Sequence, residues 1–127
     1  FYMSISNCNT VNFETCGSGA VNVDTDYSIS ATWEAGGKPV KLQNYTFEGS
    51  IKNSLGGTVL IELPTVSDDQ TTGLYIPDPS TGVIFIQIKN EDMPSPGKYP
   101  FRIMRTTPNG DIQVHMQGEY TFFTSGY

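Results

Sequence analysis

Histidine and cysteine, the side chains that most often carry catalysis and bind transition metals, are nearly absent from this sequence. It has one histidine, His115, and two cysteines, Cys8 and Cys16. A tetrahedral zinc site needs a full set of ligands, which two sulfurs and one distant histidine cannot supply. The two cysteines can close a small disulfide loop if the protein lives outside a reducing cytoplasm. The alternative is a pair of free thiols, one or both of them buried.

The single histidine has no recognisable partner for chemistry. In DIQVHMQ, residues 111–117, alternation places His115 on the polar face with Gln113 and Gln117. A general base or a metal ligand needs other groups that converge on it. The sequence also lacks GxSxG, HExxH and a phosphate-cradling Gly-rich loop. We therefore predict a surface histidine, no enzymatic activity and no cofactor.

Basic side chains are scarce, with 7 Lys and Arg against 13 Asp and Glu and a net charge of −6. A nucleic-acid-binding protein needs a basic face to displace counterions, so no nucleic-acid partner is predicted. Asp68, Asp69 and Asp78 lie in polar loops, but their spacing matches no calcium-binding loop and favours solvated turns. No apolar run approaches the roughly 20 residues that span a bilayer, so no membrane contact is predicted.

Helical periodicity is missing as well, because no window keeps apolar residues at helical spacing between a cap and a stop. Alternation with a period of two recurs instead. In DYSISATWE, residues 26–34, it places Tyr27 and Trp33 on one face. TVLIEL (58–63) and GVIFIQIK (82–89) are apolar on both faces, so both are predicted to be covered on both sides, the second as a central strand.

The last quarter of the chain, GKYPFRIMRTTPNGDIQVHMQGEYTF (97–122), predicts two strands joined by a turn at TTPNGD. Pro100, Arg102 and Met104 form the outward face of the first strand. Pro100 has no N–H, so this strand is predicted to be at a sheet edge there, or to turn that position to solvent. The predicted core residues of this hairpin are Tyr99, Phe101, Ile103, Ile112, Val114, Met116 and Tyr120.

The sequence predicts about seven or eight short strands with regular turns and no helical connections. A chain of this kind forms two sheets that pack against each other. We predict an all-β fold, an antiparallel immunoglobulin-like β-sandwich, with a small jelly roll or closed barrel as the competing architecture. Residues 1–127 are predicted to be one domain, with an N-terminal strand and loop segment over 1–25 and the sandwich over 26–124. Trp33 is the predicted central core residue.

Seven Tyr, seven Phe and one Trp are more aromatic residues than a sandwich of this size needs in its core. Aromatic residues near segment ends are Tyr2, Tyr75, Phe123 and Tyr127. Such rings can form a sugar-stacking platform or a subunit interface. We take Tyr75 together with Pro100, Arg102 and Met104 as the candidate interaction surface.

Three segments together resemble a known family: WEAGGKPVKLQNYTFEGSIKN (33–53), STGVIFIQIKNEDM (80–93) and the hairpin over 97–122. They resemble the immunoglobulin-like domains of bacteriophage tail and baseplate proteins, notably the N-terminal domain of upper baseplate proteins. The matching positions are Gly97, Tyr99, Asn109, Gly110, Gly118, Tyr120 and Phe122. The resemblance covers about residues 27–123 and not the cysteine-containing segment.

This resemblance implies a non-enzymatic virion component, assembled in the host cytoplasm as a homo-oligomer, that docks other virion proteins at the tail, baseplate or head surface. Edge strands such as 74–76 or 98–104 would pair with neighbouring subunits. The alternative hypothesis is an extracellular carbohydrate-binding or adhesin domain on a cell surface. It would stack a glycan on Tyr75, Trp33 or other aromatic rings. A small hydrolase is a third and weaker hypothesis.

Overall fold

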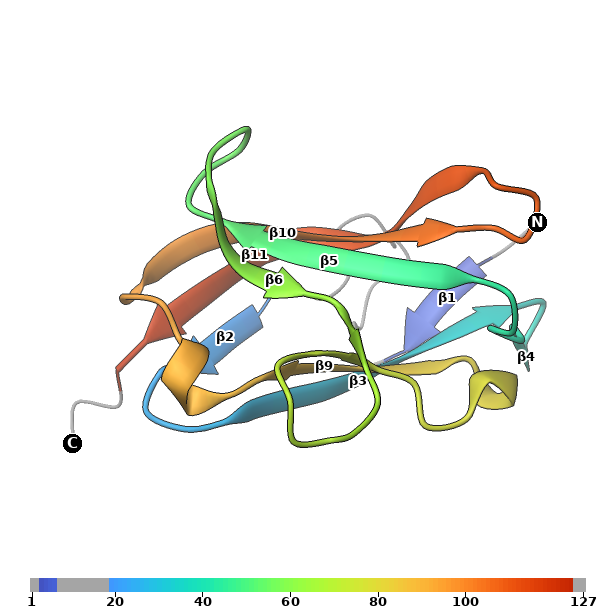
Figure 1. The fold of residues 1–127 in the computed structure, drawn as a ribbon, viewed down its shortest axis with the longest axis horizontal. Helices are drawn as coiled ribbons and strands as arrows, with labels where there is room; N and C mark the ends of the chain where they lie inside the picture. The colour runs from blue at the N-terminus through green and yellow to red at the C-terminus, as the bar shows by residue number, and fades with distance from the viewer. Residues whose placement is uncertain (1–2, 7–18, 125–127) are drawn as a thin grey trace.

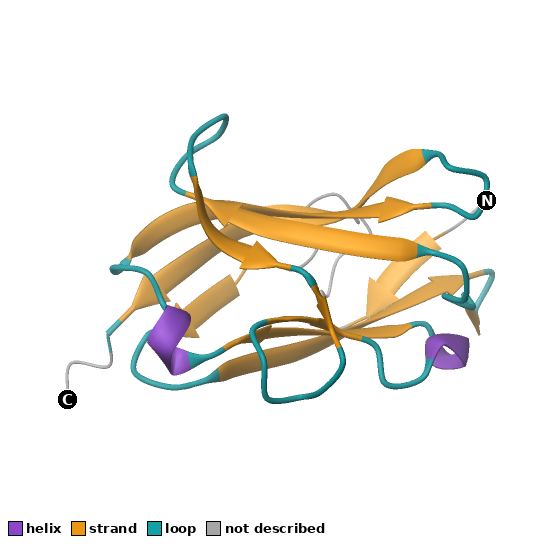
Figure 2. Cartoon of the chain, in the orientation of Figure 1, coloured by secondary structure: helices purple, strands orange, loops and turns teal. Residues whose placement is uncertain are grey.

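The described part of the chain forms two β-sheets packed face to face, joined by short loops (Figures 1 and 2). The computed structural model describes residues 3–6, by their backbone alone, and residues 19–124. Within these residues, two single-turn 3₁₀ helices lie in the loops, η2 (Pro79–Thr81) and η3 (Asn90–Asp92). Cys8 and Cys16 lie outside the described residues, so the disulfide between them stays a prediction.

The first sheet has six strands, in the order β1-β3-β9-β8-β7 with β4 paired beside β3. All neighbours are antiparallel except β7 and β8, which are parallel. The bounds are Met3–Ser6 (β1), Tyr27–Ala35 (β3), Lys38–Pro39 (β4), Thr65–Val66 (β7), Gly73–Tyr75 (β8) and Val83–Ile88 (β9).

The second sheet has five strands, in the order β2-β11-β10-β5-β6, and lies over the first in Figure 1. β2 runs parallel to β11, and the other neighbours are antiparallel. The bounds are Gly19–Asn22 (β2), Thr46–Lys52 (β5), Val59–Leu63 (β6), Gly97–Thr106 (β10) and Ile112–Phe123 (β11).

This strand order is that of an immunoglobulin-like sandwich. β3, β9 and β8 take the places of strands B, E and D, and β11, β10, β5 and β6 those of G, F, C and C′. The predicted fold class is therefore confirmed. Eleven strands are assigned within the described residues, more than predicted, because bridges as short as the two-residue β4 and β7 leave no alternation to detect in the sequence.

The core lies between the two sheets and contains Trp33, which is 5% exposed, as predicted. The Phe101 ring stacks on Tyr120 with centroids 4.4 Å apart, and the Tyr27 ring meets Tyr120 edge-on at 5.6 Å. Burying side chains of this size contributes about 1.5–3 kcal/mol each. The buried hydrophobic residues besides these are Val21, Ala31, Leu42, Phe47, Ile51, Ile61, Leu63, Leu74, Ile84, Ile86, Ile88, Ile103, Met116 and Phe122.

β9 is a central strand, as predicted, but its outer face is covered only in part, since Val83 and Phe85 there are half-buried. It lies between β3 and β8, and its inward isoleucines are fully buried. On its outer face Gln87 is also buried, because the loop before β8 folds over it. Gln87 Nε2 donates to the carbonyl oxygens of Asp68 at 3.1 Å and Thr71 at 2.9 Å.

The prediction that residues 58–63 are covered on both faces is wrong. Ile61 and Leu63 of β6 are buried, but Val59 is 38% and Leu60 44% exposed. The described residues form only two layers, so nothing among them covers the outside of this sheet. An apolar run indicates burial on both faces only where a further layer exists.

β10 is an inner strand from Phe101 onward, so the prediction of an edge strand over all of residues 98–104 is wrong, but at Pro100 itself the strand pairs with β11 alone, as predicted. β10 pairs with β11 along its length and with β5 from Phe101 onward. Pro100 lies just beyond the end of the β5 ladder, where a residue without an N–H is tolerated. The preceding Tyr99 Oη donates to the Ser95 carbonyl oxygen at 2.7 Å, the tyrosine corner found near the start of strand F in many immunoglobulin-like domains.

An extra residue in β11 changes which of its side chains face the core. Ile103 of β10 pairs with Met116, but the next residue, Met104, pairs with Val114. His115 is therefore the additional residue of a β-bulge. A bulge of one residue reverses the alternation on its two sides.

Three predictions made from unbroken alternation are therefore wrong, and one of them is Val114, which was expected in the core but is half-buried and pairs with the outward Met104. His115 was expected at the surface but is 1% exposed, and Ile112 was expected in the core but is 72% exposed. Met116, on the other side of the bulge, is buried as predicted.

Candidate interaction surface

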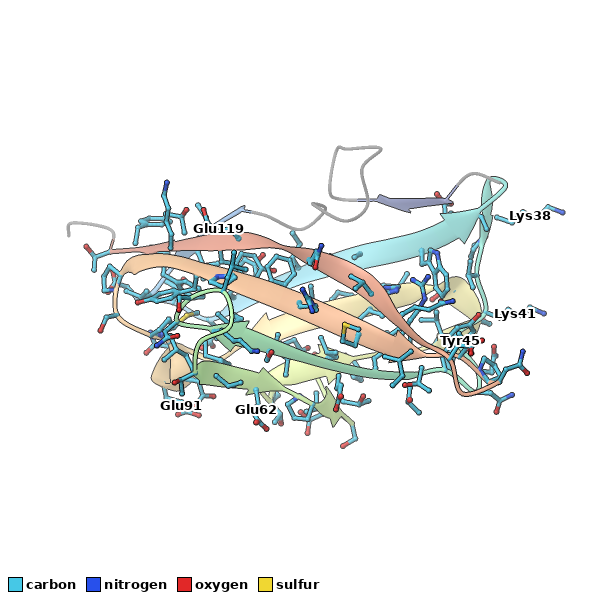
Figure 3. All side chains as sticks on the ribbon, turned by 90° about the horizontal axis from the view of Figure 1, so that it is seen from above. Lys38, Lys41, Tyr45, Glu62, Glu91 and Glu119 are labelled. Carbon is cyan, nitrogen blue, oxygen red and sulfur yellow. The ribbon has the colours of Figure 1, made fainter. Side chains whose placement is uncertain are left out.

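Three of the four predicted interaction residues lie together on the outer face of the five-stranded sheet. Pro100, Arg102 and Met104 alternate along β10 with the buried core positions. Arg102 lies opposite Gln117 of β11 and Ser50 of β5, and Arg102 Nε donates to Gln117 Oε1 at 3.1 Å. Figure 3 shows this sheet from outside, with β11, β10, β5 and β6 side by side.

A groove of about 640 Å³ crosses this face. Leu55, Pro100 and Met104 give it apolar surface, and Arg102 and Gln117 give it hydrogen-bonding groups. Leu55 lies in the loop between β5 and β6 and is 87% exposed. The groove is thus a mixed surface with a protruding leucine at its margin.

A second hollow, of about 300 Å³, adjoins the groove and shares Arg102 and Met104 with it. Glu48 and Glu62 line this hollow, whereas Lys52 lines the larger groove. Positive and negative side chains therefore occupy neighbouring parts of one face. Such a pattern can orient a partner of complementary charge pattern rather than attract any charged molecule.

Tyr75, the fourth predicted residue, does not join this surface. It lies on β8 in the other sheet, between β9 and β7, so residues 74–76 are not an open edge either. Its half-buried ring is 6.3 Å from the ring of Phe85. Alternation indicates which face a residue occupies but not which sheet its strand joins.

A polar cluster, which we call the Arg105 cluster, lies between β10, β11 and β3: buried Arg105, His115 and Trp33, with the exposed Gln113 at its margin. The Arg105 guanidinium carbon lies 4.0 Å from the centre of the Trp33 ring. Arg105 Nε donates to Gln113 Oε1 at 2.8 Å, and Nη1 lies 3.1 Å from His115 Nδ1. Because arginine only donates, Nδ1 is the acceptor and the imidazole proton is on Nε2.

Burial governs the protonation of this cluster. The His115 ring lies edge-on to the rings of Trp33 and Phe47, with centroids 5.2 and 5.1 Å away. Burial, and secondarily the positive charge of Arg105, lowers the pKa of His115 from 6.5 to about 3. Burial also lowers the pKa of Arg105. His115 is thus a neutral hydrogen-bond acceptor inside the protein, with almost no surface to offer a substrate.

Trp33 has no free ring face for a sugar. It is 5% exposed, with Arg105 over its ring and Tyr45 edge-on at 5.4 Å. The stacking role considered for Trp33 is therefore excluded, and its predicted core role is confirmed. Glycan binding by Tyr75 or another ring stays a prediction.

The loop carboxylates bond within their own turns. Asp68 Oδ1 accepts from the Gln70 N–H at 2.9 Å, and Asp78 Oδ1 accepts from the Ser80 hydroxyl at 2.7 Å and its N–H at 3.0 Å. These hydrogen bonds lower the pKa of both carboxyl groups. Within residues 3–6 and 19–124, no three His, Cys, Asp or Glu side chains are placed to hold a metal ion.

Asp26 connects the β2–β3 loop to η3. Its carboxylate accepts from the Asn90 N–H at 2.7 Å and lies 3.0 Å from Lys89 Nζ. The hydrogen bond from Asn90 and, secondarily, the interaction with Lys89 lower the pKa of Asp26.

The described residues contain no helix long and apolar enough to cross a membrane.

Comparison with known proteins identifies no family for this chain. No family model and no curated protein matches this sequence. Among solved structures, the chain is similar to murine CRIg, with 12% sequence identity, a TM-score of 0.46 and 98% of each chain covered. A likeness of this strength carries no inference about function.

The sequence did not predict the Arg105 cluster or most of the residues that line the groove. The signal for Arg105 was present, because it continues the inward alternation of Phe101 and Ile103 on β10. The contributions of Lys52 and Leu55 had no local signal, since they depend on β5 pairing with β10.

Proposed function

We propose that this chain is a non-enzymatic adaptor that acts by protein–protein contact through the outer face of the five-stranded sheet. The observation that carries the proposal is the groove around Arg102 and Met104, which combines apolar and hydrogen-bonding surface on a rigid sheet. The groove lies on β10 and β5, and these two strands are held in the sheet by β11 on one side and β6 on the other.

The residue types in the groove suit a protein partner. Arginine and methionine are enriched in the buried centres of protein interfaces, whereas Lys and Glu are depleted there. Arg102 and Met104 lie centrally, because both line the groove and the adjoining hollow. Lys52, Glu48 and Glu62 each line only one of the two, as rim residues would.

We further propose that the partners are other proteins of a bacteriophage particle, at the tail, baseplate or head surface. The support is the resemblance of residues 33–53, 80–93 and 97–122 to immunoglobulin-like domains of phage tail and baseplate proteins. The tyrosine corner at Tyr99 and the hairpin with Gly110 at its turn lie at positions that carry this resemblance.

The test is incorporation into particles. Particles would be made with Arg102→Glu or Lys38→Glu as the sole copy of the protein, and the chain quantified by mass spectrometry. Both variants reverse one positive charge, but Lys38 is exposed on β4, in the other sheet. We expect Lys38→Glu to be incorporated normally and Arg102→Glu to lose affinity for its site by about tenfold or more.

Two results would overturn the proposal. Absence of the wild-type chain from purified particles contradicts the phage setting. Normal incorporation of a folded Arg102→Glu variant contradicts the proposed surface. Circular dichroism melting of both variants shows that they are folded.

A further inference from the structure

Four charged side chains surround Ser50 on the outer face of the five-stranded sheet. Across the strands, Ser50 of β5 pairs with Arg102 of β10 on one side and with Glu62 of β6 on the other. Along β5, Glu48 lies two residues before Ser50 and Lys52 two residues after it. All four charged side chains line the groove or the adjoining hollow, so they belong to the same face.

Two apolar side chains lie diagonally on either side of Ser50. Met104 of β10 pairs with Glu48, and Val59 of β6 pairs with Lys52, a position that Val59 takes because of the β-bulge in β6. Both apolar side chains line the hollow, and Val59 is 38% exposed. Met104, Ser50 and Val59 therefore lie on one line across three strands, which we call the diagonal.

The diagonal separates the positive from the negative charges around Ser50. Arg102 and Lys52 lie on one side of it, the positive half, and Glu48 and Glu62 lie on the other, the negative half. Among the described residues, none of these four side chains takes part in an ion pair. Their charges are therefore available to a partner.

A second copy of the chain fits this face, because the two halves are complementary about a two-fold axis along the diagonal. Such an axis places the positive half of each copy over the negative half of the other. Arg102 then faces Glu48 of the second copy, and Lys52 faces its Glu62. Each contact occurs twice, because the interface is symmetric.

Other two-fold axes in this face bring like charges together. An axis along β5 places Lys52 over Lys52, and an axis across the strands through Ser50 places Arg102 over Arg102. Like charges that face each other in an interface are unfavourable. The diagonal axis avoids both and buries Met104 against Met104 and Val59 against Val59. It crosses the strands of the two copies at roughly 90°, as in orthogonal sheet packings.

We propose that two copies of this chain associate face to face through their five-stranded sheets, about a two-fold axis along the diagonal. The inference rests on the proposed function, because it names a second copy as a partner of the same outer face. It adds two contacts that the adaptor function does not require, Arg102 with Glu48 and Lys52 with Glu62.

Sedimentation velocity over a range of concentrations tests the pairing. Wild type is expected to shift from monomer to dimer as its concentration rises. Arg102→Glu and Glu48→Arg each place like charges in contact twice per dimer, so each is expected to raise the dissociation constant by about tenfold or more. The control is Lys38→Glu, a charge reversal at an exposed residue of the other sheet, which should leave dimerisation unchanged.

An equal mixture of Arg102→Glu and Glu48→Arg tests the register. In a dimer with one copy of each variant, both contacts between positions 102 and 48 again join opposite charges, so the mixture is expected to associate like wild type. The control mixture is Arg102→Glu with Glu62→Arg, because the diagonal axis places Glu62 opposite Lys52 and not opposite position 102. The control mixture is expected to stay monomeric.

Three results would overturn the proposal. They are a wild type that stays monomeric at every concentration, a test mixture that stays monomeric, and a control mixture that associates as strongly as the test mixture. No particle enters these measurements, so a monomeric wild type overturns the dimer alone and leaves the adaptor function to the incorporation of Arg102→Glu. Circular dichroism melting establishes that each variant is folded.

Discussion

Acid should destabilise this protein through its one histidine before its carboxylates titrate. His115 is buried, and its pKa is lowered from 6.5 to about 3. In the unfolded chain the imidazole regains its ordinary pKa, so below 6.5 the unfolded state binds a proton that the folded state does not. Stability is therefore lost as the pH falls from 6.5 toward 3.

The size of the loss follows from the width of this window. Each pH unit below 6.5 costs about 1.4 kcal/mol of unfolding free energy while the folded state stays neutral. From about pH 7 to about pH 5 the expected loss is roughly 2 kcal/mol. Carboxyl groups change little in this range, and His115 is the single histidine.

Urea unfolding of wild type and His115→Asn at both pH values measures this effect. Asparagine keeps an acceptor near the Nδ1 position for Arg105 but cannot take up a proton. The wild type should lose about 2 kcal/mol more than the variant between the two pH values. Parallel losses in the two proteins would refute the reasoning, whatever their absolute stabilities.

Three further outcomes follow from other contacts. Arg105→Lys should cost about 1–2 kcal/mol and shift the emission of the sole tryptophan, because a lysine cannot both stack on Trp33 and keep the two hydrogen bonds. Tyr99→Phe removes the tyrosine-corner hydrogen bond and should cost about 1 kcal/mol in urea unfolding. Gly49→Ala should cost about 1–3 kcal/mol, since its Cβ would lie 3.1 Å from two atoms of β10. The control for Gly49→Ala is Gly19→Ala, which has open space around its Cβ and should change stability by less than about 0.5 kcal/mol, with both variants measured by urea unfolding.

Alternation and turn residues were sufficient to predict the fold class. The inward and outward faces of β3 and β10 were predicted correctly. Each strand has one buried face, and its alternation is unbroken from Tyr27 to Trp33 in β3 and from Tyr99 to Ile103 in β10. The hairpin between β10 and β11 was predicted from its turn, where Gly110 has a φ of 91°.

The errors arose where the exposure of a side chain, or the sheet that its strand joins, depends on the pairing of strands far apart in the sequence. The bulge at His115 is defined by the partner residues Ile103 and Met104, so the sequence of β11 alone gives no sign of it. Exposure of Leu60 depends on the absence of a third layer among the described residues. Tyr75 was grouped with Arg102 because nothing in the sequence assigns their strands to different sheets.

The parallel pairing of β2 with β11 has a mechanical consequence. The chain enters β2 at Gly19, opposite Tyr120, and leaves β11 at Phe123, opposite Asn22. Tension between Gly19 and Phe123 therefore pulls these strands in opposite directions along their shared axis. The ladder bonds are then loaded together rather than broken one after another, and the Val23 N–H adds a bond of 2.9 Å to the Phe123 carbonyl oxygen. A domain built this way can carry force along β2 and β11 while its sandwich stays folded.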